Sequence, residues 1–239
     1  MTDQEPHSDT NRQRIAHLWR DWRGFIVFIA VMVVFRSAVA DWNQVPSGSM
    51  KPSILVGDRI VVDKLAYDLR IPFTLTRIAR WAEPHRGDVV TFPSPRDETL
   101  YVKRVIGLPG DTVELRKNRL FINGVEAQYT PLSTSEVAAL EVDNKAQYEF
   151  LREEIGTMSH VVMLRHDRDA SAYQSFPPTQ VPANQYLMLG DNRDDSGDSR
   201  VIGLVDRSRI LGRAHAIAFS LDYEHHYAPR FDRFFGGIS

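Results

Sequence analysis

The pattern of hydrophobic and polar positions changes near residue 40, and the part before it contains one long apolar run. Residues 1–23 are largely polar, whereas 25–35 are all apolar. Arg36 interrupts this run, and weakly apolar residues continue it to Ala40. Because a membrane-spanning helix needs about 17 to 25 mainly apolar residues, we predict a short transmembrane anchor at 24–40. The guanidinium of Arg36 would then reach toward the far interface.

This apolar segment has two other interpretations, which the sequence leaves open. Ser37-Ala38-Val39-Ala40 contains the small-x-small pattern that ends a cleaved signal peptide. A buried helix of a soluble protein would also contain such a run. The flanking Trp22 and Trp42 favour the anchor, because tryptophan is enriched at both membrane interfaces.

The charges around the anchor predict its orientation. Only Asp21 opposes the arginines that precede the anchor, which are Arg12, Arg14, Arg20 and Arg23. An excess of arginine is typical of the cytoplasmic side. We therefore expect 1–23 in the cytoplasm and everything beyond Trp42 on the outer, periplasmic or extracellular, face. The protein would be a single-pass protein of the inner (plasma) membrane, with the lipid bilayer as a partner.

Beyond residue 41 the pattern changes to short β-branched and aromatic runs separated by Gly, Pro and Asp. Runs this short, bounded by turn residues, predict strands of an all-β architecture. Asn123-Gly124 is a good hairpin turn, because both residues tolerate positive φ. We predict a mainly β fold whose main domain comprises 41–124 and 184–222.

Residues 125–183 interrupt this pattern of short strands. The stretch 133–152 is richer in Ala, Glu and Asn, and a polar stretch follows it. We predict a smaller region inserted between two core strands, with one short helix. The tail, 223–239, is aromatic and basic, which predicts a loosely held terminus or a surface that touches lipid.

Composition excludes several classes of function. The 239 residues have a formal net charge of −2 and include no cysteine, so disulfides, thiolate metal sites and cysteine nucleophiles are excluded. No basic stripe indicates nucleic acid as a partner. Adjacent His225 and His226 would point to opposite faces of a strand, which disfavours a metal site. We expect no metal and no cofactor.

Three short segments could carry chemistry. Ser47-Gly48-Ser49 places two hydroxyls around a glycine that lets the chain turn tightly. A serine needs a base, and no histidine here lies in a motif that exposes a nucleophile. Lysine can be that base when apolar neighbours lower its pKa, and Lys103 lies beside Val102 in such a run. Taken alone, the serine segment also fits a capped turn, and Lys103 also fits the solvent-exposed face of a strand.

The third segment, Gly190 to Arg200, is polar throughout. It fits a solvated acidic loop. It also fits a site loop in which Ser196 bonds the base lysine, while Asp198 and Arg200 form an ion pair that holds the loop.

Together these segments resemble the signal peptidase I (leader peptidase) family of serine–lysine proteases. The match covers residues 25–124 and 184–222, and its boxes follow the order of the family. The boxes are Arg36, Gln44–Pro52 with Gly57-Asp58, Arg86–Val90 with Phe92, Tyr101–Asp111, Gly190–Arg200 and Gly212–Ala214.

The resemblance implies a role for each candidate residue. Ser49 would be the nucleophile and Lys103 the general base of a signal-peptide-removing endopeptidase. Ser47 would donate to the oxyanion, and Ser196 would orient Lys103. The pockets for small side chains at the first and third residues before the cut would be lined by Val45, Met50, Ile54 and Val102. The implied fold is an all-β catalytic core with a smaller inserted region, acting on secretory preproteins after small-x-small motifs.

Other functions fit the same features. A conjugation-type maturation protease would share the serine–lysine apparatus but process one dedicated partner. A membrane-tethered β module could instead bind exported chains without cutting them. Soluble self-cleaving repressors are disfavoured, because no DNA-binding region is visible and an anchor is predicted.

Overall fold

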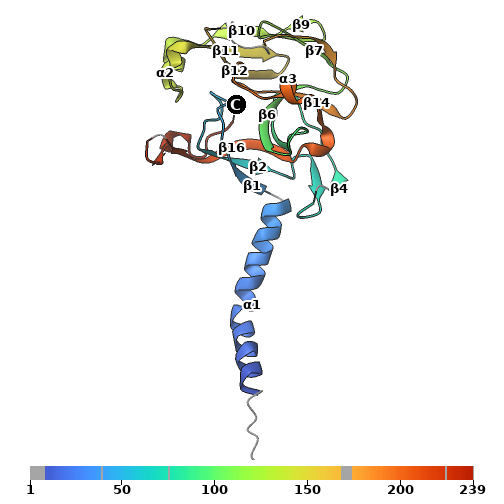
Figure 1. The fold of residues 1–239 in the computed structure, drawn as a ribbon, viewed down its shortest axis with the longest axis vertical. Helices are drawn as coiled ribbons and strands as arrows, with labels where there is room; N and C mark the ends of the chain where they lie inside the picture. Colours follow the sequence, from blue (N-terminus) through green and yellow to red (C-terminus); the bar gives the residue numbers. More distant parts are fainter. Residues whose placement is uncertain (1–8, 39, 75, 168–173, 224, 239) are drawn as a thin grey trace, which may run out of the picture.

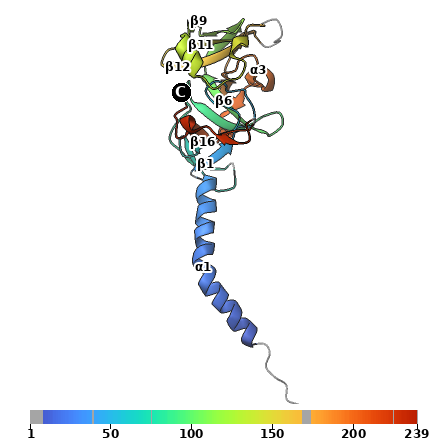
Figure 2. The same ribbon diagram turned by 90° about the vertical axis from the view of Figure 1, so that its left-hand side faces the viewer.

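A long helix leads into a β domain. The computed structural model describes residues 9–38, 40–74, 76–167, 174–223 and 225–238. Helix α1 spans Asp9–Ala38, and strand β1 begins at Ala40. Figure 1 shows α1 projecting away from the β domain, and the turned view in Figure 2 shows the same arrangement. The helix therefore begins well before the predicted anchor and ends two residues before Ala40.

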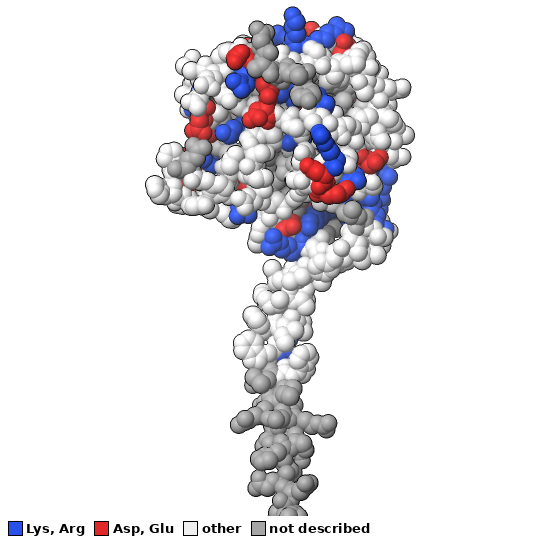
Figure 3. All heavy atoms as spheres, in the orientation of Figure 1, with Lys and Arg blue, Asp and Glu red and all other residues white. Residues whose placement is uncertain are grey.

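From Trp19 to Val34 the large apolar side chains that the structure describes in α1 are exposed, and Arg23 is exposed among them. The part of the helix next to the domain presents mostly uncharged side chains (Figure 3). Across the described residues, no helix combines the length and the apolar character that crossing a membrane requires.

The main sheet has eight strands, in the order β1-β2-β16-β5-β6-β14-β15, with β17 paired to β16. Its neighbouring strands are antiparallel. In chain order the strands are β1 (Ala40–Gln44), β2 (Asp58–Asp63), β5 (Val89–Pro93), β6 (Leu100–Gly107), β14 (Gln185–Leu189), β15 (Val205–Asp206), β16 (Gly212–Asp222) and β17 (Ala228–Pro229). The predicted mainly β fold is confirmed.

Two smaller sheets lie at the end of the domain opposite α1 (Figure 1). One has the order β13-β7-β8-β9, and the other β10-β11-β12. Their strands are β7 (Thr112–Arg116), β8 (Arg119–Ile122), β9 (Val125–Glu126), β10 (Gln128–Pro131), β11 (Tyr148–Ile155), β12 (Met158–Arg165) and β13 (Phe176–Gln180). The predicted hairpin at Asn123-Gly124 is present, with positive φ at both residues.

The predicted insertion, 125–183, does not form one separate body. Strands β9 and β13 belong to it, yet they pair with β8 and β7 from the preceding segment. Residues 128–165 form the three-stranded sheet together with α2 (Thr134–Ala139) and the 3₁₀ helix η1 (Lys145–Gln147). The predicted short helix is therefore present, and it begins with a capping box at Ser133.

The C-terminal tail is packed on the domain rather than loosely held. Strand β17 pairs with β16, and the 3₁₀ helix η4 (Phe231–Arg233) follows it. The guanidinium of Arg233 donates to the buried carboxylate of Asp58, with Nη2 and Oδ2 2.7 Å apart. Arg230 donates to the carbonyl of Val56. These bonds connect the tail to the segment that follows β1.

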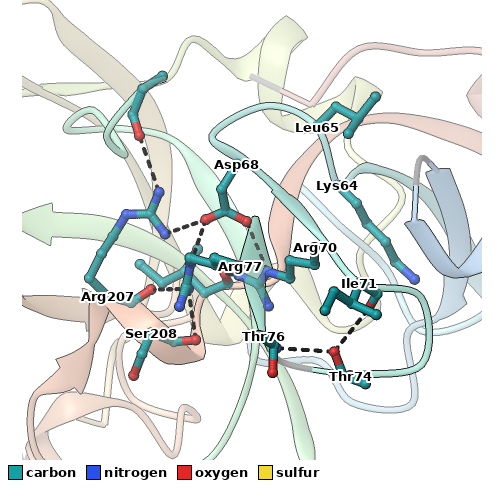
Figure 4. A network of polar contacts seen from close by, with 12 residues as sticks. Lys64, Leu65, Asp68, Arg70, Ile71, Thr74, Thr76, Arg77, Arg207 and Ser208 are labelled. Atoms are coloured by element: carbon teal, nitrogen blue, oxygen red, sulfur yellow. Dashed lines mark hydrogen bonds and ion pairs between the residues drawn. The ribbon is translucent and has the colours of Figure 1, made fainter. Parts of the chain in front are cut away.

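A buried carboxylate fastens a small hairpin to the domain (Figure 4). Strands β3 (Asp68–Arg70) and β4 (Arg77–Arg80) form this hairpin. Asp68 accepts from Arg70 Nε at 2.8 Å, Arg77 Nε at 2.8 Å and Arg207 Nη1 at 2.9 Å. Burial would raise the pKa of Asp68, but these bonds outweigh it and lower the pKa. Arg207 begins the 3₁₀ helix η3 (Arg207–Arg209), which directly follows β15. Its bond to Asp68 therefore attaches the hairpin to the edge of the main sheet.

Candidate active site

The segment after β1 folds into tight turns that hold Ser49 in place. The amide of Lys51 donates to the Gly48 carbonyl at 3.0 Å, and that of Ile54 to the Met50 carbonyl at 2.9 Å. Met50 and Ile54 belong to a buried apolar cluster with Val45 and residues of β2, β5 and β16. The apolar residues around Ser49 thus fix the backbone that carries its hydroxyl.

Strand β6 brings Lys103 to this hydroxyl. Lys103 pairs with Val90 of β5, and the residue is only 4% exposed. Its Nζ lies 2.6 Å from Ser49 Oγ and 3.1 Å from the Val102 carbonyl oxygen. The Tyr101 ring centroid lies 5.2 Å from the same nitrogen. The two residues, 54 positions apart in sequence, therefore form a buried hydroxyl–amine pair.

Burial changes the acidity of Lys103. Loss of solvent disfavours the charged ammonium and lowers the pKa to about 8, although Asp198 and Asp191 act in the opposite direction. A neutral amine within hydrogen-bond distance of a hydroxyl can accept its proton. The pair can therefore generate an oxygen nucleophile at mildly alkaline pH.

The loop 190–200 is tied together by Asp198. This residue caps helix α3 (Ser199–Ile202), and its carboxylate accepts from Arg200 and from the amide of Gly190, the latter at 2.9 Å. Asp198 and Arg200 form an ion pair with Oδ2 and Nη2 2.7 Å apart. Burial would raise the pKa of Asp198, but the bonds from Arg200 outweigh it and lower the pKa.

Asn192 connects this loop to the serine segment. Its backbone amide donates to the Ser49 carbonyl and its side-chain amide to the Gly48 carbonyl, each at 3.1 Å. Sequence reasoning did not single out Asn192. In the sequence, Asn192 is an amide in a segment rich in aspartate, and this pattern does not predict which groups the amide bonds.

Ser47 and Ser196 lie at the site, but neither makes a short hydrogen bond to Ser49 or Lys103. The Ser47 hydroxyl donates to Ser49 Oγ over a long 3.4 Å. The Ser196 hydroxyl is buried and makes no hydrogen bond to Lys103. Oxyanion binding by Ser47 and orientation of the lysine by Ser196 stay predictions.

A cleft of about 560 Å³ opens over the pair. Val45, Met50 and Val102 line it together with Ser49 and Lys103, whereas Ile54 lies in the apolar cluster behind. A larger and more open hollow of about 680 Å³ lies beside β7 and β13. It contains Lys117 and Ser175, but only the backbone amide of Lys117 bonds that serine, so it offers no comparable chemistry. Among the described residues, no cluster of acids and histidines could hold a metal.

Reactivity of Ser49 should follow the titration of Lys103. Since the base must be neutral and its pKa is lowered to about 8, acylation of Ser49 by a small ester should rise as pH increases through 8. Below that midpoint the rate should fall about tenfold per pH unit. The measurement is the rate of covalent labelling of Ser49 against pH, and a rate independent of pH between 6 and 9 would contradict the prediction.

Gly190 should tolerate no side chain. A Cβ there would overlap the Ser49 carbonyl oxygen and the Ser196 hydroxyl, which belong to the site itself. Gly190→Ala should lower Ser49 labelling at least tenfold and destabilise the fold by about 1–3 kcal/mol through overpacking. Gly237→Ala, where a Cβ meets open space, is the matched control. Equal labelling of the two variants would contradict this prediction.

Comparison with known proteins identifies the family. A sequence profile described as "Signal peptidase, peptidase S26" matches residues 19–219. Proteins named signal peptidase I are similar: that of Pseudomonas fluorescens is 35% identical, over 83% of this chain and 71% of its own. The signal peptidase I of Rickettsia conorii is 33% identical, over 84% of this chain and 79% of its own. A crystal structure of a signal peptidase I from Enterococcus faecalis is 33% identical, over 55% of this chain and 97% of its own, with a TM-score of 0.33. This chain therefore belongs to the signal peptidase (peptidase S26) family.

Proposed function

We propose that this protein is a membrane-tethered serine endopeptidase that removes signal peptides from exported preproteins. The observation that carries the proposal is the buried contact of 2.6 Å between Lys103 Nζ and Ser49 Oγ. The relatives named signal peptidase I support the substrate class. Among the described residues, Lys103 alone suffices as the base for Ser49.

The chemistry follows from this contact. Neutral Lys103 takes the proton of Ser49, whose oxygen attacks the scissile carbonyl. The oxyanion that forms accepts hydrogen bonds from the Ser49 amide and the Ser47 hydroxyl. The protonated lysine then gives its proton to the leaving amine, which leaves an ester on Ser49. Water, deprotonated by Lys103, attacks this ester and releases the new carboxyl end.

The shape of the cleft supports cutting after small-x-small motifs. Its walls include Val45, Met50 and Val102, which are apolar and tightly packed. Apolar walls of this kind favour a small uncharged side chain over a charged one. Ser196 would orient the lysine.

The surface of α1 supports a tether in the bilayer. From Phe25 to Val34 the exposed residues of the helix are all apolar, and an uninterrupted run of this length presents apolar surface on every side, which is costly in water. The large ones are Phe25, Ile26, Val27, Phe28, Ile29, Val31, Met32, Val33 and Val34. We place the anchor at 24–40, with residues 1–23 in the cytoplasm.

The end of α1 nearest the domain carries the polar groups that an interface would need. Arg36 Nε donates to Asp41 at 2.8 Å, and its guanidinium lies 5.5 Å from the Trp42 ring centroid. Lys64 donates to the carbonyls of Arg36 and Ser37 at the helix end, where a cation is favoured. These contacts draw the charge of Arg36 toward the domain and away from the apolar run. They support a cleft held at the outer membrane surface.

Removing either member of the pair should abolish processing. Ser49→Ala eliminates the nucleophile and Lys103→Ala the base, so signal-peptide cleavage should fall by at least 1000-fold. Both variants should remain folded, because each shortens one side chain within an intact core. The measurement is cleavage of a panel of unrelated preproteins, with circular dichroism as the control for folding.

Three results would contradict the proposal in different ways. Parental cleavage by Lys103→Ala would exclude the lysine as base. Cleavage of only one dedicated preprotein would favour the maturation-protease alternative. Binding of preproteins without Ser49-dependent cleavage would favour a non-catalytic module.

The anchor should determine where the protein is found. The full chain should remain in the membrane fraction after carbonate extraction, while a chain beginning at Asp41 should lose this retention. Placing Phe28→Glu and Val31→Glu together in the apolar run should also lower retention, because charges at the bilayer centre are costly. The exposed substitution Val125→Glu is the matched control. Full retention of the double variant would contradict the anchor.

A further inference from the structure

The three-stranded sheet formed by 128–165 buries a carboxylate with no role in the chemistry above. Glu153 lies on β11 and is 0% exposed. Its two oxygens accept from the two terminal nitrogens of Arg193, at 2.6 Å and 2.7 Å. The Tyr129 hydroxyl also donates to this carboxylate. Such a paired contact fixes the orientation of both planar groups.

Arg193 belongs to the loop that holds Asp198. It is fully buried and lies next to Asn192 in the chain. His160, across from Glu153 on β12, does not compete as a cation, because burial lowers its pKa to about 4. The carboxylate of Glu153 therefore has the guanidinium as its permanent positive partner.

The backbone strengthens this connection. Met163 of β12 donates to the Asp191 carbonyl at 2.9 Å and accepts from the Arg193 amide at 3.1 Å. The amide of Arg165 donates to the carboxylate of Asp194 at 2.9 Å. The loop 191–194 is thus held along β12 as a short continuation of the sheet.

The opposite side of this loop contacts the nucleophile. Asn192 donates to the carbonyls of Gly48 and Ser49. A continuous set of bonds therefore runs from Glu153 through Arg193 and Asn192 to Ser49. A shift of the loop would move the backbone that sets the 2.6 Å contact between Ser49 and Lys103.

We propose that Glu153 is a positioning residue, and that the three-stranded sheet serves to hold the loop 191–194 against the Ser49 segment. This inference rests on the proposed serine–lysine chemistry. A buried ion pair is a poor means of adding stability, because desolvation offsets its attraction. Its geometric precision suits the placement of a backbone, and misplacement by about 1 Å can cost about 100-fold in rate.

The test compares two buried carboxylates in the full-length, membrane-inserted protein. Glu153→Gln should lower kcat for preprotein cleavage by about 10- to 100-fold, with KM changed by less than about threefold. Acylation of Ser49 by p-nitrophenyl acetate should fall by the same factor, because that step needs no preprotein binding. The matched control is Asp68→Asn, a buried carboxylate bonded to arginines none of which lies in the loop. It should lower the melting temperature but leave kcat at the parental value.

A second variant separates the effect of Glu153 on the placement of the loop from its effect on the stability of the fold. Glu153→Met with Arg193→Met removes the charges together, so it should fold even if Glu153→Gln does not. Its kcat should still be reduced, because the oriented contact is gone. Parental kcat in either folded Glu153 variant, or an equal loss in Asp68→Asn, would overturn the inference. Ser49→Ala and Lys103→Ala are assayed alongside: if they retain activity, the proposed function fails instead.

Discussion

The site depends on a buried Lys103 amine whose hydrogen bonds go to the Ser49 hydroxyl and the Val102 carbonyl, and not to a carboxylate. A carboxylate in direct contact would favour the ammonium and cancel the effect of burial. The two nearby acids, Asp198 and Asp191, each bond an arginine instead: Asp198 bonds Arg200, and Asp191 bonds Arg104 at 2.7 Å. The arginines thus hold the acids in place and limit their influence on the lysine.

Several charged side chains are buried on and beside the loop 190–200. Glu153, Asp191, Arg193 and Asp198 are all nearly inaccessible to solvent. Each carries several hydrogen bonds, as a buried charge requires. Around the Lys103 amine, burial and Arg200 lower the pKa, whereas Asp198 and Asp191 oppose them. The Glu153–Arg193 pair is bonded to the loop that carries Asn192 instead.

The sequence predicted what is encoded locally. Asn123-Gly124 indicated a hairpin because two adjacent residues suffice for that turn. Ser49 and Lys103, which the structure brings into contact, were singled out because their boxes occur in the order of a known family. Glu153 and Asn192 were missed because a charged residue in a strand and an amide in a loop look alike whether buried or solvated. The pairing of β13 with β7 was also missed, since some sixty residues separate strands whose contact appears only in three dimensions.

The order of the parts along the chain has a consequence for biogenesis. Ser49 is synthesised first and Lys103 next, but the loop 190–200 that holds the backbone of Ser49 comes late, after the sheet on which it docks. A nascent chain can contain Ser49 and Lys103 and yet lack the loop that bonds the Ser49 backbone. The order of synthesis therefore makes assembly of this region a late step of folding.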